Sequence, residues 1–274
     1  MGDRSTCRPE ASLELKSIGA RAILDPAYGG RLASLCIEGV EILVTERGHE
    51  MDWGCYVMAP WAGRIRGGRF EWGGSSIQLP QNLPPHALHG TVFGQPWVRQ
   101  DEGTLACSLG SKWPWTGEVR SHVSLRPDRL IWRVEVHAES DAFPAVVGWH
   151  PWFRRQLSNG SLLALQFAPK AMLVRDPAGI PTGDRVRPTP GPWDDCFVDV
   201  ERSPTLRWSD GLEVEVSSTC THWVVYSEPE HAICVEPQSG PPDAFNLGQF
   251  EIARPGCPVV HTMTLRWNTA RSSQ

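Results

Sequence analysis

Residues 130–137 read LIWRVEVH, in which leucine, tryptophan and two valines occupy every second position. Neighbouring side chains of a β-strand point to opposite faces of the sheet, so this alternation predicts a strand with one buried and one solvated face. The same pattern appears at residues 212–216 (LEVEV) and across residues 259–267. Half-buried strands of this kind are typical of antiparallel sheets. The three segments therefore predict an all-β fold.

Short strands separated by turns are expected along the rest of the chain. The 26 glycines and 24 prolines interrupt it often, and no stretch of ten or more residues shows the 3.6-residue period of a helix. We predict further strands at 13–17, 20–25, 31–37, 40–44, 68–72, 75–79, 96–100, 104–109, 117–125, 162–168, 197–201, 223–226 and 232–236. The expected architecture is a large antiparallel β-sandwich or barrel with few short helices.

One domain is expected over residues 12–268, because no repeat, linker or change in composition divides this range. Residues 1–11 and 269–274 are predicted to be loose termini. The segment 176–192 is rich in proline, glycine and arginine, and we expect it to be a long loop.

The charge balance restricts the class of partner. The chain has 26 Lys and Arg against 31 Asp and Glu, a net charge of −5, and no long basic cluster. Nucleic acid and anionic membranes are therefore not the expected partners. No stretch approaches the roughly 18 apolar residues of a membrane helix. The N-terminal segment lacks the apolar centre of a signal peptide, so we expect a cytoplasmic protein.

The eight cysteines are predicted to be buried thiols. None of them forms a C-x-x-C pair, which is the spacing that zinc and redox sites use. Without a secretion signal, disulfides are not expected. The cysteine pattern therefore predicts no metal site.

Four polar clusters interrupt the strand pattern. The first, residues 59–70, holds Arg64, Arg66 and Arg69 among glycines and tryptophans. Arginines in such a segment can form a fork-like set of hydrogen-bond donors for a polar ligand, or they can cover an ordinary surface loop before a hairpin. The sequence alone leaves both interpretations open.

Histidines mark the next two clusters. Residues 84–90 place His86 and His89 in a turn bounded by proline and glycine. They can bind a metal, handle protons or serve a structural role, and no H-E-x-x-H pattern favours the metal. In residues 147–153, His150 lies between two tryptophans at the end of an apolar strand. Apolar surroundings disfavour the imidazolium form, and a core histidine is the alternative interpretation.

The fourth cluster, residues 235–246, begins with Glu236 at the end of an apolar run. Partial burial raises the pKa of a carboxyl group, as a base that works near neutral pH requires, whereas an ion pair with an arginine is the alternative. The 13 tryptophans offer faces on which sugar rings can stack, although most should belong to the core. Together the clusters are compatible with an acid–base site for a sugar.

At these clusters the sequence resembles the aldose 1-epimerase, or galactose mutarotase, family. The matching strings are YGGRL at 28–32, GRIRGGRF at 63–70, HALHG at 86–90, GWHPWF at 148–153, and the segment 236–246, which begins with EPQ. They cover nearly the whole chain. The resemblance implies a large antiparallel β-supersandwich with the sugar in an open cleft.

The resemblance also implies a reaction. Glu236 corresponds to the general base that takes the proton from the anomeric C1 hydroxyl, and His150 to the general acid that protonates the ring oxygen. The ring opens to the aldehyde, the C1–C2 bond rotates, and reclosure gives the other anomer. The chain is thus expected to be an isomerase that needs no metal and no organic cofactor.

Further site residues follow from the same resemblance. His89 matches a second histidine that hydrogen-bonds the sugar near the reacting centre, and Arg64 matches a sugar-binding arginine. Asp194 resembles a hydroxyl-binding aspartate, with Asp195 as the alternative. Gln238, in the EPQ string, is also assigned to sugar binding. The expected partner is a small-molecule sugar, and the expected assembly is a monomer or homodimer.

Two departures from the family pattern leave the sugar open. Gly63 replaces the usual asparagine before Arg-Ile, and PWFR at 151–154 replaces the usual aromatic-Phe-Asn ending. One alternative is a hexose-phosphate 1-epimerase whose phosphate is bound by Arg66, Arg69, Arg154 or Arg155. Others are a different acid–base reaction on a cyclic hemiacetal, and a non-catalytic carbohydrate-binding protein of the same fold. The presence of both an acid and a base argues against a pure binder.

Overall fold

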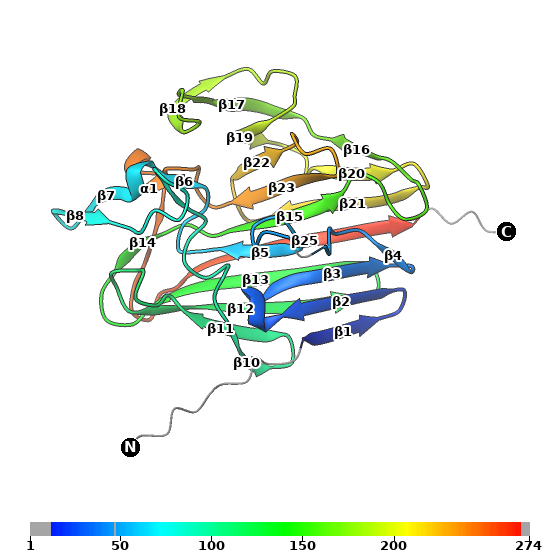
Figure 1. Cartoon of the computed structure of the whole chain (residues 1–274), viewed down its shortest axis with the longest axis horizontal. Coiled ribbons are helices and arrows are strands. Elements are labelled where there is room, and N and C mark those ends of the chain that lie inside the picture. Colours follow the sequence, from blue (N-terminus) through cyan, green and yellow to red (C-terminus); the bar gives the residue numbers. More distant parts are fainter. Residues whose placement is uncertain (1–11, 47, 270–274) are drawn as a thin grey trace.

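Two large antiparallel sheets make up most of the structure, a computed structural model that describes residues 12–46 and 48–269 (Figure 1). The first sheet has eleven strands, of which the short β4 (Val40–Glu41) pairs only with β3. The others lie in the order β1 (Leu13–Ser17), β2 (Ala20–Asp25), β3 (Arg31–Ile37), β5 (Cys55–Met58), β15 (Gly148–Arg154), β23 (Ala232–Gln238), β22 (His222–Tyr226), β19 (Asp194–Val200), β17 (Pro169–Arg175) and β18 (Pro181–Val186).

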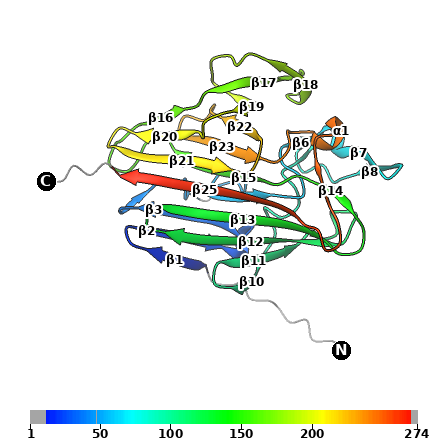
Figure 2. The ribbon, with the colours of Figure 1, turned by 180° about the vertical axis from the view of Figure 1, so that it is seen from behind.

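The second sheet has eight strands and lies behind the first, as the reverse view shows (Figure 2). Its order is β10 (Val98–Asp101), β11 (Thr104–Ser108), β12 (Gly117–Arg126), β13 (Arg129–Ala138), β25 (Val259–Thr269), β21 (Leu212–Ser218), β20 (Thr205–Trp208) and β16 (Leu163–Gln166). The paired sheets confirm the prediction of a large antiparallel all-β sandwich.

Smaller elements complete the described part of the chain. The strand pairs are β6 (Arg64–Ile65) with β9 (Ala87–Leu88), β7 (Arg69–Trp72) with β8 (Ser75–Gln78), and β14 (Phe143–Ala145) with β24 (Glu251–Ala253). The helical elements are α1 (Ala244–Leu247) and two single 3₁₀ turns, at Pro26–Tyr28 and Arg66–Gly68. The prediction of few short helices is confirmed. Among the described residues, no helix has the length and apolar character needed to cross a membrane.

The alternating segments form the core where the sequence predicts it. On β13, Leu130, Trp132, Val134 and Val136 are all fully buried. The residues between them are partly or fully exposed, so this strand has one face in the core and one toward solvent. Burying a tryptophan and several aliphatic side chains on one strand contributes much of the free energy that holds the second sheet to the first.

The central strands of the first sheet show no alternation, because both of their faces are covered. All of β5 and β23 and most of β15 are buried. Trp149 on β15 pairs with Val57 on β5, and these fully buried residues belong to the apolar core. On each strand, the residues that adjoin Trp149 or Val57 in sequence point to the opposite face of the sheet. That opposite face carries the polar residues described below.

Two expectations about the chain's irregular parts are wrong. The segment 176–192 is not a continuous loop, because β18 forms within it and pairs with β17. Residue 269 is not part of a loose terminus, since β25 extends to Thr269 and pairs it with Leu212. Residues 1–11 and 270–274 lie outside the described residues. The boundaries of one domain at 12–268 stay a prediction.

Candidate active site

Side chains from five neighbouring strands of the first sheet form one row that lines a cavity. Tyr56 on β5 is opposite His150 on β15, and Glu236 on β23 is opposite Val224 on β22. Val224 is in turn opposite Cys196 on β19. All five line a cavity of about 290 Å³. Backbone hydrogen bonds fix the register of the strands, so the sheet itself holds this row in position.

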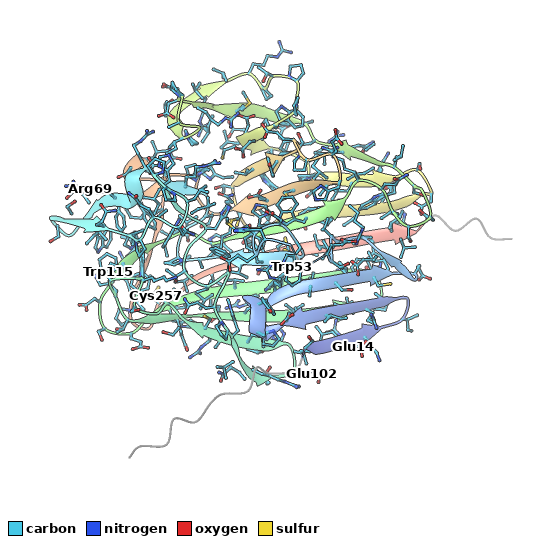
Figure 3. The ribbon with its side chains drawn as sticks, in the orientation of Figure 1. Glu14, Trp53, Arg69, Glu102, Trp115 and Cys257 are labelled. Carbon is cyan, nitrogen blue, oxygen red and sulfur yellow. The ribbon has the colours of Figure 1, made fainter. Side chains whose placement is uncertain are left out.

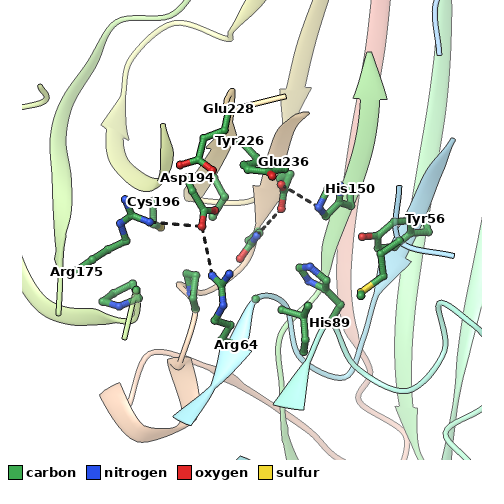
Figure 4. Close-up of a pocket in the computed structure, with 18 of the residues that line it drawn as sticks. Tyr56, Arg64, His89, His150, Arg175, Asp194, Cys196, Tyr226, Glu228 and Glu236 are labelled. Carbon is green, nitrogen blue, oxygen red and sulfur yellow. Dashed lines mark hydrogen bonds and ion pairs between the residues drawn. The ribbon is translucent and has the colours of Figure 1, made fainter. Parts of the chain in front are cut away.

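Loops and strand ends complete the cavity (Figure 4). Arg64 comes from β6, His89 from the turn after β9, Arg175 from the end of β17, and Asp194 from the start of β19. The volume lies at the lower end of the range for ligand pockets, which suits a molecule the size of a monosaccharide. Aromatic, cationic and anionic groups share the wall.

His150 and Glu236 are in direct proximity in this wall. The Nε2 atom of His150 lies 3.3 Å from Oε1 of Glu236, and the two side chains are only 7% and 2% exposed. Gln238 donates a hydrogen bond from Nε2 to Oε2 of Glu236, at 3.1 Å. Because Gln238 lies two residues along β23 from Glu236, the strand's own geometry brings the amide to the carboxyl. Both oxygens of the carboxyl group are therefore oriented.

Burial shifts the pKa values of this pair toward the neutral forms. The pKa of Glu236 lies well above its ordinary value, first because of burial and second because of the negative charge of Asp194. The pKa of His150 falls to about 3, mainly through burial, and the positive charge of Arg31 lowers it further. At neutral pH the pair therefore favours a protonated carboxyl beside a neutral imidazole, with one proton to exchange between them.

The imidazole of His150 lies in a series of stacked rings. Its centroid is 4.8 Å from that of Tyr56 and 5.4 Å from that of Trp152, with interplanar angles of 22° and 17°. Trp152 stacks in turn on His231 at 6.1 Å. The hydroxyl of Tyr56 is buried and has no hydrogen-bond partner among the described residues. These contacts restrict rotation of the His150 ring and hold its Nε2 toward the carboxyl.

A buried arginine lies beneath the same series of rings. Arg31 is fully buried, and its guanidinium carbon lies 5.3 Å from the ring centre of Tyr56. The guanidinium donates hydrogen bonds to three backbone carbonyl oxygens, at 2.7, 3.1 and 3.3 Å, which belong to Tyr28, Trp53 and Phe93. Burial lowers the pKa of Arg31 to about 10, which still leaves it charged at neutral pH. Arg31 of the YGGRL string thus places a buried positive charge beside Tyr56, where it lowers the pKa of His150.

The turn that carries His89 depends on a glycine. His89 and Gly90 both adopt left-handed backbone conformations, with φ of 60° and 82°. A Cβ atom on Gly90 would lie 2.0 Å from the carbonyl oxygen of Ala59, so only glycine fits. The His89 ring meets His150 edge-on, with centroids 5.1 Å apart. Burial also holds the pKa of His89 well below its ordinary value.

Asp194 joins two arginines in the cavity wall. Its Oδ2 atom lies 3.5 Å from Nη1 of Arg64 and 3.4 Å from Nη1 of Arg175. Asp195 instead pairs with Nε of Arg175, at 2.7 Å, and lies outside the lining of this cavity. Of the two aspartates that the sequence leaves as alternatives, Asp194 is therefore the one placed to contact a ligand here.

The structure brings together every site residue that the sequence predicts. All six predicted residues are among those that line the cavity: Glu236, His150, His89, Arg64, Asp194 and Gln238. Tyr56, Trp152 and Arg175 line it too, and the sequence pattern predicts no site role for them. Tyr56 lies in an apolar run and Arg175 in a strand that the pattern does not predict. Only the register between distant strands could have identified them.

Other polar residues of the predicted clusters have structural roles. His86 accepts a hydrogen bond on Nδ1 from the backbone of Gly67, at 3.2 Å, and does not line the cavity. Gly63 has a φ of 66°, and a Cβ atom there would lie 2.7 Å from Pro242. The glycine that replaces the family's asparagine is thus required by the close approach of the segment around Pro242.

Comparisons with known proteins identify the family and the fold. The sequence profile of the aldose 1-epimerase family matches residues 13–266. A galactose mutarotase-like protein from Clostridium acetobutylicum superposes with a TM-score of 0.80 at 17% identity, covering 93% of this chain and 94% of the other. Galactose 1-epimerase from Lactobacillus acidophilus gives a TM-score of 0.78 at 16% identity, with 98% of each chain covered.

A curated relative adds a partial match. The uncharacterised protein YphB of Escherichia coli K12 is 30% identical over 111 residues, a stretch that spans 37% of each chain. The family profile, in contrast, extends over nearly all of the sequence, and the solved structures share its galactose mutarotase-like sandwich. The chain belongs to the aldose 1-epimerase family.

Proposed function

We propose that the protein interconverts the α and β anomers of an unphosphorylated aldose by acid–base opening and closing of the sugar ring. The proposal is carried by the position of His150 and Glu236, with Nε2 and Oε1 3.3 Å apart in the wall of a monosaccharide-sized cavity. In a cyclic aldose the anomeric hydroxyl and the ring oxygen are bound to the same carbon. An acid and a base that serve these two oxygens must therefore lie side by side.

Proton transfer in this scheme is reversible. As a carboxylate, Glu236 accepts the proton of the anomeric hydroxyl, while His150, as an imidazolium, donates a proton to the ring oxygen. The bond between C1 and the ring oxygen breaks, leaving the aldehyde, a protonated Glu236 and a neutral His150. After rotation about C1–C2, both groups reverse their roles and the ring closes. The cycle consumes no proton.

The electrostatics of the pair suit the open-chain half of this cycle. Burial raises the pKa of Glu236 and lowers the pKa of His150, so the neutral pair is favoured. That is the protonation state that accompanies the aldehyde in the proposed scheme. Before the ring opens, the shared proton must therefore move from Glu236 to His150, and ring opening returns the pair to its favoured neutral state.

Sugar binding is assigned to the remaining predicted residues. Arg64 offers donors and Asp194 offers acceptors, and each hydroxyl of a sugar can do both. The Oε1 atom of Gln238 and the Nδ1 atom of His89 are buried polar atoms that lack a hydrogen-bond partner within the described chain. A sugar hydroxyl would satisfy them, because buried polar groups are costly when they are left unpaired.

The arginines considered for a phosphate are engaged elsewhere. Arg66 pairs with Asp176 at 2.8 Å, and Arg154 pairs with Glu46 at 2.7 Å. The guanidinium of Arg155 donates to backbone carbonyls. Arg69 lies on the hairpin of β7 and β8 at the outer end of the molecule (Figure 3). None of the four is among the residues that line the cavity.

Charges that do line the cavity also oppose a phosphate. Arg64 and Arg175 share the carboxylate of Asp194, so part of their charge is already neutralised. Two further carboxylates, those of Asp52 and Glu228, face the same space. A phosphorylated sugar would add a dianion next to them. This arrangement favours a neutral sugar over a hexose phosphate.

The test is polarimetry on freshly dissolved α-D-glucose and α-D-galactose. Wild type is expected to accelerate relaxation for at least one sugar, and Glu236→Gln to lose about 10²–10⁴ in rate, because it removes the base while keeping the shape. Calorimetry should show that Glu236→Gln still binds the sugar. His86→Gln, whose histidine lies outside the cavity, is the matched control and should keep its rate.

Other outcomes favour the alternatives. Sugar binding without faster relaxation would favour a non-catalytic carbohydrate-binding protein. Anomer exchange seen by NMR with hexose phosphates alone would favour a hexose-phosphate 1-epimerase. Glu236→Gln with an unaltered rate would contradict the assigned base. A cytoplasmic location and a monomeric or homodimeric state stay predictions.

A further inference from the structure

Cys234 places a thiol beside the acid–base pair. It lies on β23 two residues before Glu236, so both side chains point to the same face of the sheet. Its neighbours in register are Trp152 on one side and Tyr226 on the other. The thiol is free and fully buried. The proposed epimerase chemistry makes no use of it.

A nitrogen, a sulfur and an oxygen atom meet at this position. The ligand atoms of His150, Cys234 and Glu236 all lie within 4.8 Å of one another. His150 Nε2 and Glu236 Oε1 are 3.3 Å apart. A tetrahedral zinc ion with bonds of about 2.0 Å to nitrogen and oxygen would separate those two ligands by about 3.3 Å as well. The thiol sulfur would need to approach by at most slightly more than about 1 Å to complete the set.

We propose that His150, Cys234 and Glu236 form a zinc-binding site at the wall of the cavity, with the buried Cys234 outside its lining, and that bound zinc blocks the acid–base pair. Three protein ligands leave the fourth tetrahedral position open, where water or a sugar hydroxyl can bind. Mixed nitrogen, sulfur and oxygen ligands favour zinc over magnesium and calcium, which prefer oxygen alone. Metal binding does not rest on the proposed function, whereas the inhibition does.

The charges balance when zinc enters. The thiol of Cys234 and the carboxyl group of Glu236 each give up a proton to solvent, and neutral His150 offers a lone pair directly. The two positive charges of the ion then face one thiolate and one carboxylate, so the buried site has no net charge. A buried site with unbalanced charge would be strongly disfavoured.

The first experiment uses Co²⁺ alone as the probe. Cobalt bound to a thiolate in a tetrahedral site absorbs in the near ultraviolet and the visible, and we expect both absorptions with one ion per chain. Cys234→Ser should lose the near-ultraviolet absorption. Cys196→Ser is the matched control, because Cys196 lines the same cavity two strands from Glu236 and should leave the spectrum unchanged. Absence of the absorption in wild type, or its persistence in Cys234→Ser, would overturn the site.

The second experiment measures inhibition of anomerisation by Zn²⁺. We expect wild type to lose activity and to recover it when a chelator is added. Cys234→Ser should need at least roughly tenfold more zinc for half inhibition of its own rate. Should that variant fail to fold by circular dichroism, Glu236→Gln must weaken cobalt binding instead, or the site is wrong. If wild type never accelerates mutarotation, the proposed function fails while the cobalt spectrum still decides the metal site.

Discussion

Tyr56 and His150 lie opposite each other on neighbouring strands, and their rings stack with centroids 4.8 Å apart. Trp152 stacks on the same imidazole, and His89 meets it edge-on. Stacking of this kind fixes the plane of the imidazole and directs Nε2 toward Glu236. A proton donor must be held within a fraction of an ångström of its productive position. The aromatic groups therefore position the proposed acid, although they transfer no proton themselves.

Two substitutions of Tyr56 should separate the contribution of ring packing to stability from that of the hydroxyl group. Tyr56→Phe keeps the stacked ring and removes a buried hydroxyl that no described group satisfies. We expect the free energy of unfolding, measured in urea, to be equal to or above that of wild type. Tyr56→Ala should lose about 3–5 kcal/mol and most of its activity. A large loss of stability in Tyr56→Phe would contradict the absence of a hydrogen bond at this hydroxyl.

Replacing Arg31 should change both the free energy of unfolding and the pKa of His150. Arg31→Met leaves three backbone carbonyls without their donor and should cost at least about 3 kcal/mol of unfolding free energy. Loss of the positive charge should also raise the pKa of His150, which an NMR titration of its ring protons can follow. Arg31→Lys keeps the charge and should shift the pKa less. Identical titrations in Arg31→Met and wild type would refute the electrostatic coupling.

The pH dependence of turnover should follow the proton that the pair shares. Adding a second proton requires charging His150, whose pKa is about 3, so the rate should stay level as the pH falls from 7 to 4. The alkaline decline should lie well above the ordinary pKa of a glutamic acid, because burial raises the pKa of Glu236. Initial rates corrected for spontaneous mutarotation check this. A decline of the rate on the acid side with a midpoint near 6.5 would instead indicate a solvent-exposed histidine.

His150 should reduce the free energy of unfolding in acid because it is buried in its neutral form. Its pKa is about 3 when folded and near 6.5 when unfolded, so below pH 6.5 the unfolded chain binds more protons. His150 should therefore cost wild type unfolding free energy between pH 6.5 and pH 3, by at most about 1.4 kcal/mol per pH unit, while Glu236, whose pKa burial raises, acts with the opposite sign. His150→Gln should lack this part of the loss. Urea unfolding of both proteins at pH 7, 5 and 4 gives the difference, and parallel curves would contradict it.

How much of the fold the sequence predicts depends on how each strand is buried. Strands with one solvated face, such as β13, β21 and β25, can be predicted from the alternation of apolar and polar residues. The continuous apolar run of β5 gives no such signal, because core covers one face and the site covers the other. The pairing of β18 with β17 was missed because proline and glycine in the segment 176–192 resemble a loop.

Part of the candidate site could also be predicted from the sequence, because some of its residues are unusual in their surroundings and others are not. Glu236, His150 and His89 are costly groups in apolar or tight surroundings, so they stand out in the sequence, and the family resemblance supplies their roles. Tyr56 and Cys234 are ordinary core residues by type. Their position next to the acid–base pair follows only from the register of β5, β15 and β23, which one sequence does not contain.

The row across the first sheet also has a consequence for biosynthesis. Its five members come from β5, β15, β19, β22 and β23, so the ribosome must release the chain past Gln238 before the row can exist. Until then β15 can pair with β5, but the edge that later pairs with β23 has no partner. The side chains of β15 are almost wholly apolar. Such edges are the places where nascent chains mispair, and chaperones bind the apolar surface that they expose. Recovery of the proposed activity during refolding would therefore report the long-range pairing of β15 with β23 rather than the formation of local hairpins.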